Sequence, residues 1–91
     1  MLTYEDCLAF CDLTEDEIEA IAEHEHIPAI VAMELGQYLV QTDDGVRKIK
    51  RIILDDIEAA RKNSEQNRYL VLKATFQHFV DTHPDNTSRT D

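Results

Sequence analysis

The chain has 91 residues, of which 43% are hydrophobic and 31% charged, and its formal net charge at pH 7 is −10. A length near 100 residues supports one hydrophobic core, and this composition is typical of a globular domain rather than a disordered chain. No apolar run approaches the roughly 18 residues of a membrane-spanning helix, and the acidic balance argues against nucleic-acid binding, so we expect neither membrane nor nucleic acid as a partner.

The first predicted helix covers residues 4–12. Thr3 can cap its start, and four residues recur at spacings of three and four on one face, which indicates that this face is buried: Tyr4, Cys7, Leu8 and Cys11. This stretch has acidic residues where a signal peptide needs basic ones, which favours a cytoplasmic location. Cys7 and Cys11 would need a strained geometry to form a disulfide, and a reducing compartment keeps them as free thiols.

A capping box predicts the start of the second helix. Thr14 is followed three residues later by Glu17, so that the hydroxyl and the carboxylate can each accept a hydrogen bond from the other residue's amide. This helix runs to about residue 26 and turns Ile18, Ile21 and Ala22 inward. Because Pro28 disfavours helical geometry at Ile27 and suits the first turn of a helix, we expect a bend at Ile27 and a new helix from Pro28.

The third predicted helix, residues 28–41, has two apolar stripes. The first stripe is assigned to the core and consists of Ile27, Val31, Leu35, Tyr38 and Leu39. The second contains smaller residues that allow a close approach by another helix: Ala29, Met33, Gly36 and Val40. Since one stripe is enough for a core, the second predicts a symmetric homodimer with these four residues at or near the interface.

The C-terminal half predicts two more helices. The fourth, residues 44–62, follows a turn at residues 42–45 and has an inner face of Val46, Ile49, Ile53, Ile57 and Ala60. The fifth, about 64–80, has a stripe of Tyr69, Leu72, Phe76 and Phe79. Residues 69–72 have local strand propensity, but a helix is favoured because no other segment offers a pairing partner.

These elements predict an all-α fold, a small bundle of four to five helices around the central apolar helix from Pro28 to Gln41. Residues 1–82 form a single helical domain in this interpretation. Residues 83–91 are polar and rich in turn formers, with nothing to bury, and we expect them to form a disordered tail.

Two cysteines and two histidines have the residue types of a tetrahedral zinc site: Cys7, Cys11, His24 and His26. The two histidines are separated by a single residue, whereas zinc fingers use three to five, and side chains at positions i and i+2 of a helix point to different faces. The competing interpretation places the cysteines in the core as small hydrophobic residues and the histidines at the C-terminal end of a helix, where positive charge is favourable.

A second metal hypothesis rests on Glu23 and His26, which have the Glu-x-x-His spacing of di-iron carboxylate bundles. A complete site needs two such elements and further glutamates, so a symmetric dimer would have to supply the second pair, with Glu34 as the bridging residue. The short helices and the bend at the ligand argue against this arrangement, and the competing interpretation is a solvated acidic helix end.

The charges are divided along the chain. All nine basic residues lie at or after Arg47, whereas twelve of the nineteen acidic residues lie in the first 46. Either the acidic half packs against the basic residues, within one fold or across a dimer, or an acid-rich surface faces a basic protein partner. The basic cluster, formed by Arg47, Lys48, Lys50 and Arg51, is interpreted as a solvated helix face paired at i, i+4 spacing with Asp43 and Asp44.

Recognised enzyme signatures are absent from the sequence, which has two glycines and no phosphate-cradling loop. We therefore expect a non-catalytic protein-protein interaction or regulatory module without a cofactor, one that associates with itself. The alternative is a small metal-binding helical protein that uses the cysteines, histidines and glutamates named above.

Overall fold

The structure is a computed structural model that describes residues 3–84 and contains, within them, five helices and no strand. The helices are α1 (Tyr4–Ala9), α2 (Glu15–Glu25), α3 (Ala29–Leu39), α4 (Asp43–Lys62) and α5 (Gln66–Thr82). The predicted all-α bundle is confirmed. Over the same residues, no helix is both long enough and apolar enough to cross a membrane.

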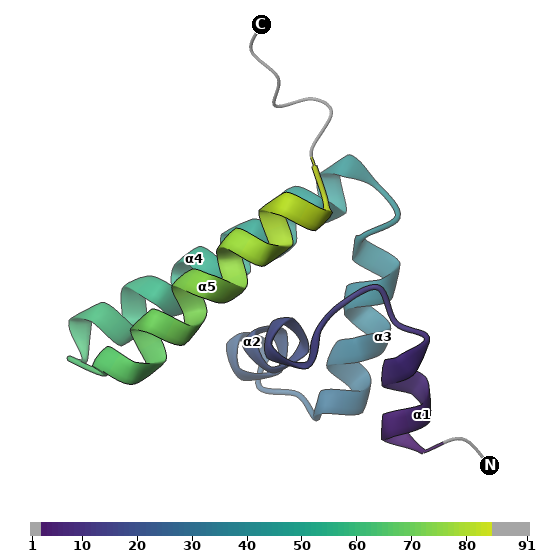
Figure 1. Cartoon of the computed structure of the whole chain (residues 1–91), viewed down its shortest axis with the longest axis horizontal. Coiled ribbons are helices and arrows are strands. Elements are labelled where there is room, and N and C mark those ends of the chain that lie inside the picture. The colour runs from purple at the N-terminus through teal and green to yellow at the C-terminus, as the bar shows by residue number, and fades with distance from the viewer. Residues whose placement is uncertain (1–2, 85–91) are drawn as a thin grey trace, which may run out of the picture.

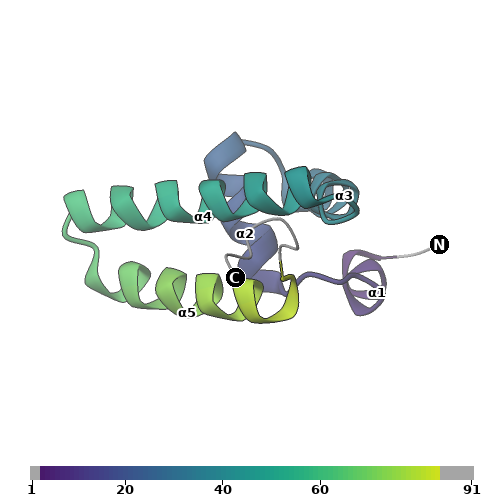
Figure 2. The same cartoon turned by 90° about the horizontal axis from the view of Figure 1, so that it is seen from above.

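The two longest helices form an antiparallel hairpin, in which α4 and α5 run side by side (Figure 1 and Figure 2). α2 crosses this hairpin and contacts both of its helices, and it also packs against α3. The short helix α1 lies next to α3 at the edge of the molecule, farthest from the α4–α5 turn (Figure 1). The residues 69–72 that have strand propensity are helical and belong to α5.

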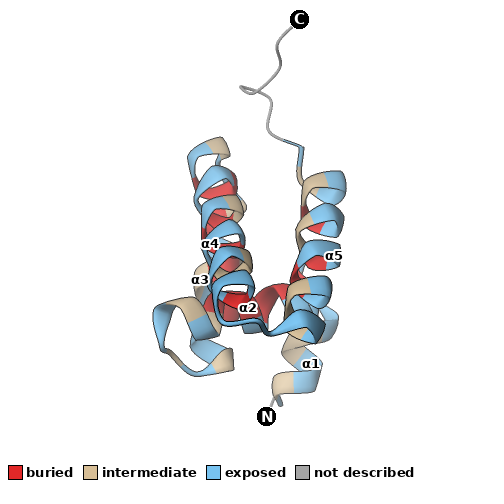
Figure 3. Cartoon of the chain, turned by 90° about the vertical axis from the view of Figure 1, so that its left-hand side faces the viewer, coloured by how far each residue is buried: buried red, intermediate tan, exposed pale blue. Residues whose placement is uncertain are grey.

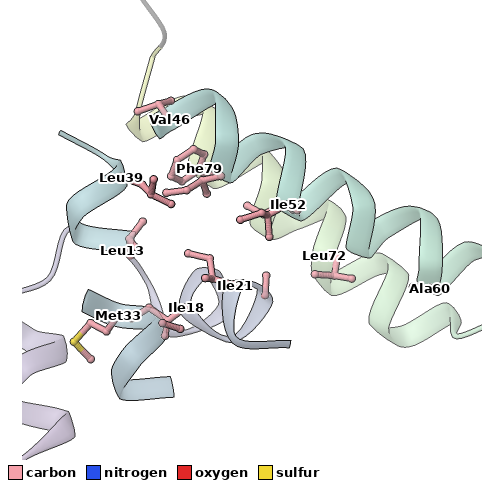
Figure 4. Close-up of a cluster of buried hydrophobic side chains, with 14 residues drawn as sticks. Leu13, Ile18, Ile21, Met33, Leu39, Val46, Ile52, Ala60, Leu72 and Phe79 are labelled. Atoms are coloured by element: carbon pink, nitrogen blue, oxygen red, sulfur yellow. The ribbon is translucent and has the colours of Figure 1, made fainter. Parts of the chain in front are cut away.

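The core lies where α2 meets the hairpin, and its buried residues line the facing sides of α4 and α5 (Figure 3). Figure 4 shows the side chains that converge there from α2, α3, α4 and α5. Five of the largest have no exposed surface: Ile18, Ile21, Ile49, Ile53 and Phe79. Each such side chain contributes roughly 1.5–3 kcal/mol when it leaves water, so this convergence holds the four longer helices together.

Both predicted N-caps are present. The Thr14 hydroxyl accepts a hydrogen bond from the Glu17 amide at 3.2 Å, and the Glu17 carboxylate accepts one from the Thr14 amide at 2.8 Å. Thr3 and Asp6 form the same reciprocal pair at the start of α1. The predicted bend is also present, because His26 ends α2 in the left-handed conformation with φ 58° and Pro28 is the N-cap of α3.

The predicted end of the first helix is wrong by about three residues, since α1 ends at Ala9 rather than near residue 12. The amides of Phe10 and Cys11 close a tighter turn by donating to Cys7 and Leu8. The next amide, that of Asp12, donates to the side chain of Gln37 on α3 at 2.9 Å. A tertiary partner therefore replaces the helical one, and the chain leaves the helix to reach the cap of α2.

The core face of α3 also differs from the prediction. Met33 and Gly36, which were assigned to a free second stripe, are buried, whereas Val31 and Tyr38 of the predicted core stripe are 42% and 69% exposed. The remaining residues of the second stripe, Ala29 and Val40, are partly buried against the core. Leu39 of the predicted core stripe is buried, and Ile27 and Leu35 are partly buried against the core, so the prediction fails at Val31 and Tyr38, where α3 keeps exposed apolar surface.

Gly36 explains this orientation. A Cβ atom at this position would lie 2.3 Å from Leu13 Cδ1 and 3.2 Å from Ile21 Cδ1, so both side chains pack directly onto the glycine backbone. Only a residue without a side chain allows this approach, and it turns the small-residue face of α3 toward α2.

The C-terminal end of α5 extends to Thr82, and His83 follows as its C-cap with its ring stacked on Phe79 at 4.6 Å between centroids. Most of the predicted disordered tail, residues 85–91, lies outside the described residues.

Candidate functional site

An open groove of about 480 Å³ lies between α1 and α3. Its first wall comes from α1 and the residues just after it, namely Cys7, Phe10 and Cys11. Its second wall comes from one side of α3 and the residues after it, namely Met33, Glu34, Gln37, Tyr38 and Gln41. We call this feature the α1/α3 groove.

Two aromatic side chains flank the groove and point largely into solvent. Phe10, the C-cap of α1, is 80% exposed, and Tyr38 near the end of α3 is 69% exposed. Scattered exposed apolar residues are normal on protein surfaces, but two aromatic rings beside an apolar depression form a contiguous patch of the kind that marks interaction sites. Phe10 was not among the predicted site residues, and Tyr38 was predicted to lie in the core.

The groove has a fixed inner side. Met33 is 4% exposed and belongs to the core, while Cys7 and Cys11 are half-buried free thiols. The Cys11 thiol donates to Gln37 Oε1 at 3.2 Å, and the same oxygen accepts the Asp12 amide. Gln37 therefore ties the segment after α1 to α3, and this contact holds the two walls of the groove at a set distance.

The surroundings of the groove are acidic. Glu34 lies on its rim, Glu5 and Asp12 are exposed on the α1 side, and the first 46 residues contain no lysine or arginine. Tyr4 on α1 is also close to acidic groups. Its pKa is raised mainly by burial and, to a smaller extent, by the negative charges of Glu15 and Glu19. The α1/α3 face thus carries negative charge without a neighbouring cation from its own part of the chain.

The predicted metal ligands are not brought together. Cys7, Cys11 and Glu34 line the α1/α3 groove, whereas Glu23, His24 and His26 lie at the far end of α2. Glu23 pairs with Arg68 of α5, and His26 forms the C-cap. Within residues 3–84, no three His, Cys, Asp or Glu side chains are grouped so that they could hold a metal ion.

His24 and its neighbours instead form a polar cluster between α2, α4 and α5. The two nitrogens of His24 lie 2.9 Å from Glu25 and 3.1 Å from Asp55. Burial lowers the pKa of His24, but these two hydrogen bonds outweigh it and leave the pKa above its usual value.

Asp56 belongs to the same cluster. Within the described part of the chain, its Oδ2 atom is buried and has no hydrogen-bond partner. Burial raises the pKa of Asp56 to about 6, although His24 and Arg68 act in the opposite direction. This carboxylate is therefore held in an unfavourable environment, and no local sequence pattern marks it.

A third polar contact joins the start of α2 to α5. Glu17 has no exposed surface, and its Oε2 atom lies 3.0 Å from Nδ1 of His78. Glu17 was predicted only as a capping residue, and its contact with His78 was not expected. The contact secures the helix pair, and neither group lies at the α1/α3 groove.

The basic cluster lies on α4, where Lys48 and Arg51 are exposed. Arg47 pairs with Asp44 at i, i+3 spacing rather than at the predicted i, i+4 spacing. This face belongs to α4, while the acidic groove is formed by α1 and α3.

No protein-family model, curated protein or solved structure matches the chain.

Proposed function

We propose that the chain is a non-catalytic protein-protein interaction module whose binding surface is the α1/α3 groove. The observation that carries this proposal is the open apolar groove with Phe10 and Tyr38 exposed beside it. Aromatic side chains dominate the binding energy of protein interfaces, and burial of an exposed ring by a partner removes a large apolar area from water. The groove is open along its length, which suits a peptide segment better than an enclosed small molecule.

The chemistry of the groove supports a binding role rather than a catalytic one. Its nucleophilic side chains are Cys7 and Cys11, and the Cys11 thiol is hydrogen-bonded to the amide oxygen of Gln37. No histidine lines the groove, so neither thiol has an imidazole base beside it there. A cytoplasmic location is part of the proposal, because half-buried thiols of this kind stay reduced in that compartment.

Self-association stays a prediction, but its surface changes. Met33 and Gly36 are buried within the single chain, so they would reach a second copy only if the core opened. Ile30 and Val31 are each 42% exposed on the outer side of α3. We place the homodimer contact at these two residues, outside the set that lines the groove.

The proposed binding surface is tested by selecting peptides from a random display library against the full chain. Amide chemical shifts of the labelled protein then locate the selected peptides. We expect shifts at residues 7–11 and 33–41, and a loss of affinity of at least tenfold in Phe10→Ala and in Tyr38→Ala.

Leu70→Ala is the matched control, because Leu70 is a large apolar residue of α5 that is 63% exposed and does not line the groove. Its affinity for the same peptides should equal that of the wild type. Peptides that bind all three variants equally, or that shift residues on another face, would refute the proposal.

A further inference from the structure

We infer that the α1/α3 groove takes a basic amphipathic helix from a partner protein, an inference that rests on the proposed function. Two properties of the groove lead to this occupant: its walls come from two helices and the turns that end them, and the charge around it is acidic. The first property selects the conformation of the partner segment, and the second selects its charge.

The helical walls favour a helix over an extended strand. α3 is a helix, and in the first wall the amides of Phe10, Cys11 and Asp12 already donate within the chain, so the groove offers no sheet edge to which a strand could add. Contact must therefore be made by side chains. The α3 wall from Met33 to Gln41 is nine residues long and spans roughly 12 Å at 1.5 Å per residue, which matches about two turns of a docked helix.

The charges favour a basic helix. Glu34 lines the groove and Asp12 follows its first wall directly; both are exposed, and no salt bridge involves them within the described residues. The basic residues of the chain begin at Arg47 and lie on α4, α5 and the C-terminal residues. A partner with lysine or arginine beside its apolar stripe supplies the missing positive charge, whereas an acidic helix would be repelled.

The same charges disfavour a second copy of the chain as the occupant. In a symmetric dimer formed across the groove, each Glu34 and its acidic surroundings would face the same groups of the other copy.

The proposed partner helix has apolar residues at positions i, i+3 or i+4, and i+7, and these fill the space between Phe10 and Tyr38. Its basic residues flank that stripe and face the acidic rim.

The inference is tested with three labelled peptides that share one helical pattern of leucines and differ only at the flanking positions, which are lysine, glutamine or glutamate. Fluorescence anisotropy with the full chain gives each Kd at low and at high salt. We expect the lysine peptide to bind at least tenfold more tightly than the glutamine peptide, the glutamate peptide to be weakest, and the advantage of lysine to shrink as salt rises.

Two variants locate the interaction. Glu34→Gln should raise the Kd of the lysine peptide about threefold and leave the Kd of the glutamine peptide unchanged. Glu65→Gln is the matched control, because it removes an exposed carboxylate of the α4–α5 turn and should change neither peptide. Phe10→Ala should weaken all peptides that bind.

The outcomes separate the inference from the proposed function. If the glutamine peptide binds the groove as tightly as the lysine peptide, the basic helix is refuted while the groove remains a binding surface. If none of the three binds but library peptides map to the groove, the inference fails alone. If Phe10→Ala leaves the affinity for the lysine peptide unchanged, the binding is nonspecific charge attraction and the inference is overturned. A dimer in which the second copy closes the groove would show a different occupant and would also overturn it.

Discussion

Replacing Asp56 should stabilise the fold at neutral pH. This half-buried carboxylate of α4 is surrounded by Glu23 and His24 of α2, Asp55 of α4 and Arg68 of α5. Its Oδ2 atom has no hydrogen-bond partner in the described part of the chain. Burial without a partner disfavours the charged form, so the folded state binds a proton at this site more tightly than the unfolded state does.

The size of the effect follows from the pKa, which rises from 3.8 to about 6 on folding. At 1.36 kcal/mol per pKa unit, the full shift corresponds to roughly 3 kcal/mol of lost stability well above pH 6. The penalty is absent below the unfolded pKa, grows between the two pKa values and is complete above the folded one. Because the side chain is only half-buried, solvent screening reduces the expected penalty to about 1 kcal/mol.

Asp56→Asn keeps the size of the side chain and removes its charge. Urea unfolding should show a gain of about 1 kcal/mol at pH 7.5 and about half of that at pH 5.0, where the wild-type carboxyl is mostly protonated in the folded state. A gain of equal size at both pH values would show that the gain does not come from ionisation of Asp56. A loss of stability at pH 7.5 would show that the Asp56 carboxylate has a favourable partner in the folded state.

Asp55→Asn is the matched control from the next position of α4. Asp55 lies 3.1 Å from His24 and helps to raise the pKa of that histidine above 6.5. A raised histidine pKa stabilises the fold fully below 6.5, and this contribution is lost as the pH rises through the folded value. Asp55→Asn should therefore destabilise the fold, and more so at pH 5.0 than at pH 7.5, which is the opposite sign to its neighbour.

Three further predictions concern the fold and its association. Gly45→Ala should cost about 2 kcal/mol or more in thermal unfolding, because the added Cβ would lie 1.8 Å from the backbone oxygen of Leu39; an unchanged midpoint would contradict this close approach. Thr14→Ala should cost about 1 kcal/mol in urea unfolding through the loss of the cap on α2, and an unaltered midpoint would argue against the capping box. Val31→Glu should leave the unfolding free energy within about 0.5 kcal/mol and shift a homodimer toward monomer in sedimentation equilibrium, whereas a wild-type monomer at tens of micromolar would rule out the dimer.

Local signals predicted the helices well because their causes lie within a few residues. The capping box of Thr14 and Glu17, the proline after α2 and the apolar spacing of α4 each act over one or two turns. The prediction for the core face of α3 was wrong in part, at Val31 and Tyr38 and at the buried Met33 and Gly36, for a different reason. Two apolar stripes on one helix are nearly equivalent by hydrophobicity, and the choice between them is made by Gly36, whose backbone meets Leu13 and Ile21.

The candidate groove could be predicted only in part. Cys7 and Cys11 were recognised as chemically notable, but their neighbours across the groove come from α3, which the sequence cannot place. Phe10 lies outside the apolar face of α1, and from that position its exposure could have been predicted. The burial of Glu17 had no such sign, because its contact with His78 joins residues 61 positions apart.

The groove combines a firmly held wall with a weakly held one. α3 buries several residues in the core, whereas the six residues of α1 include none that is buried. An isolated helix of this length is not stable in water, so α1 depends on its capping box and on partial burial of its apolar side chains against the core. Such an element opens at a lower free-energy cost than the core does. A partner that packs against Phe10 therefore adds the burial that α1 lacks, and binding and the ordering of α1 stabilise each other.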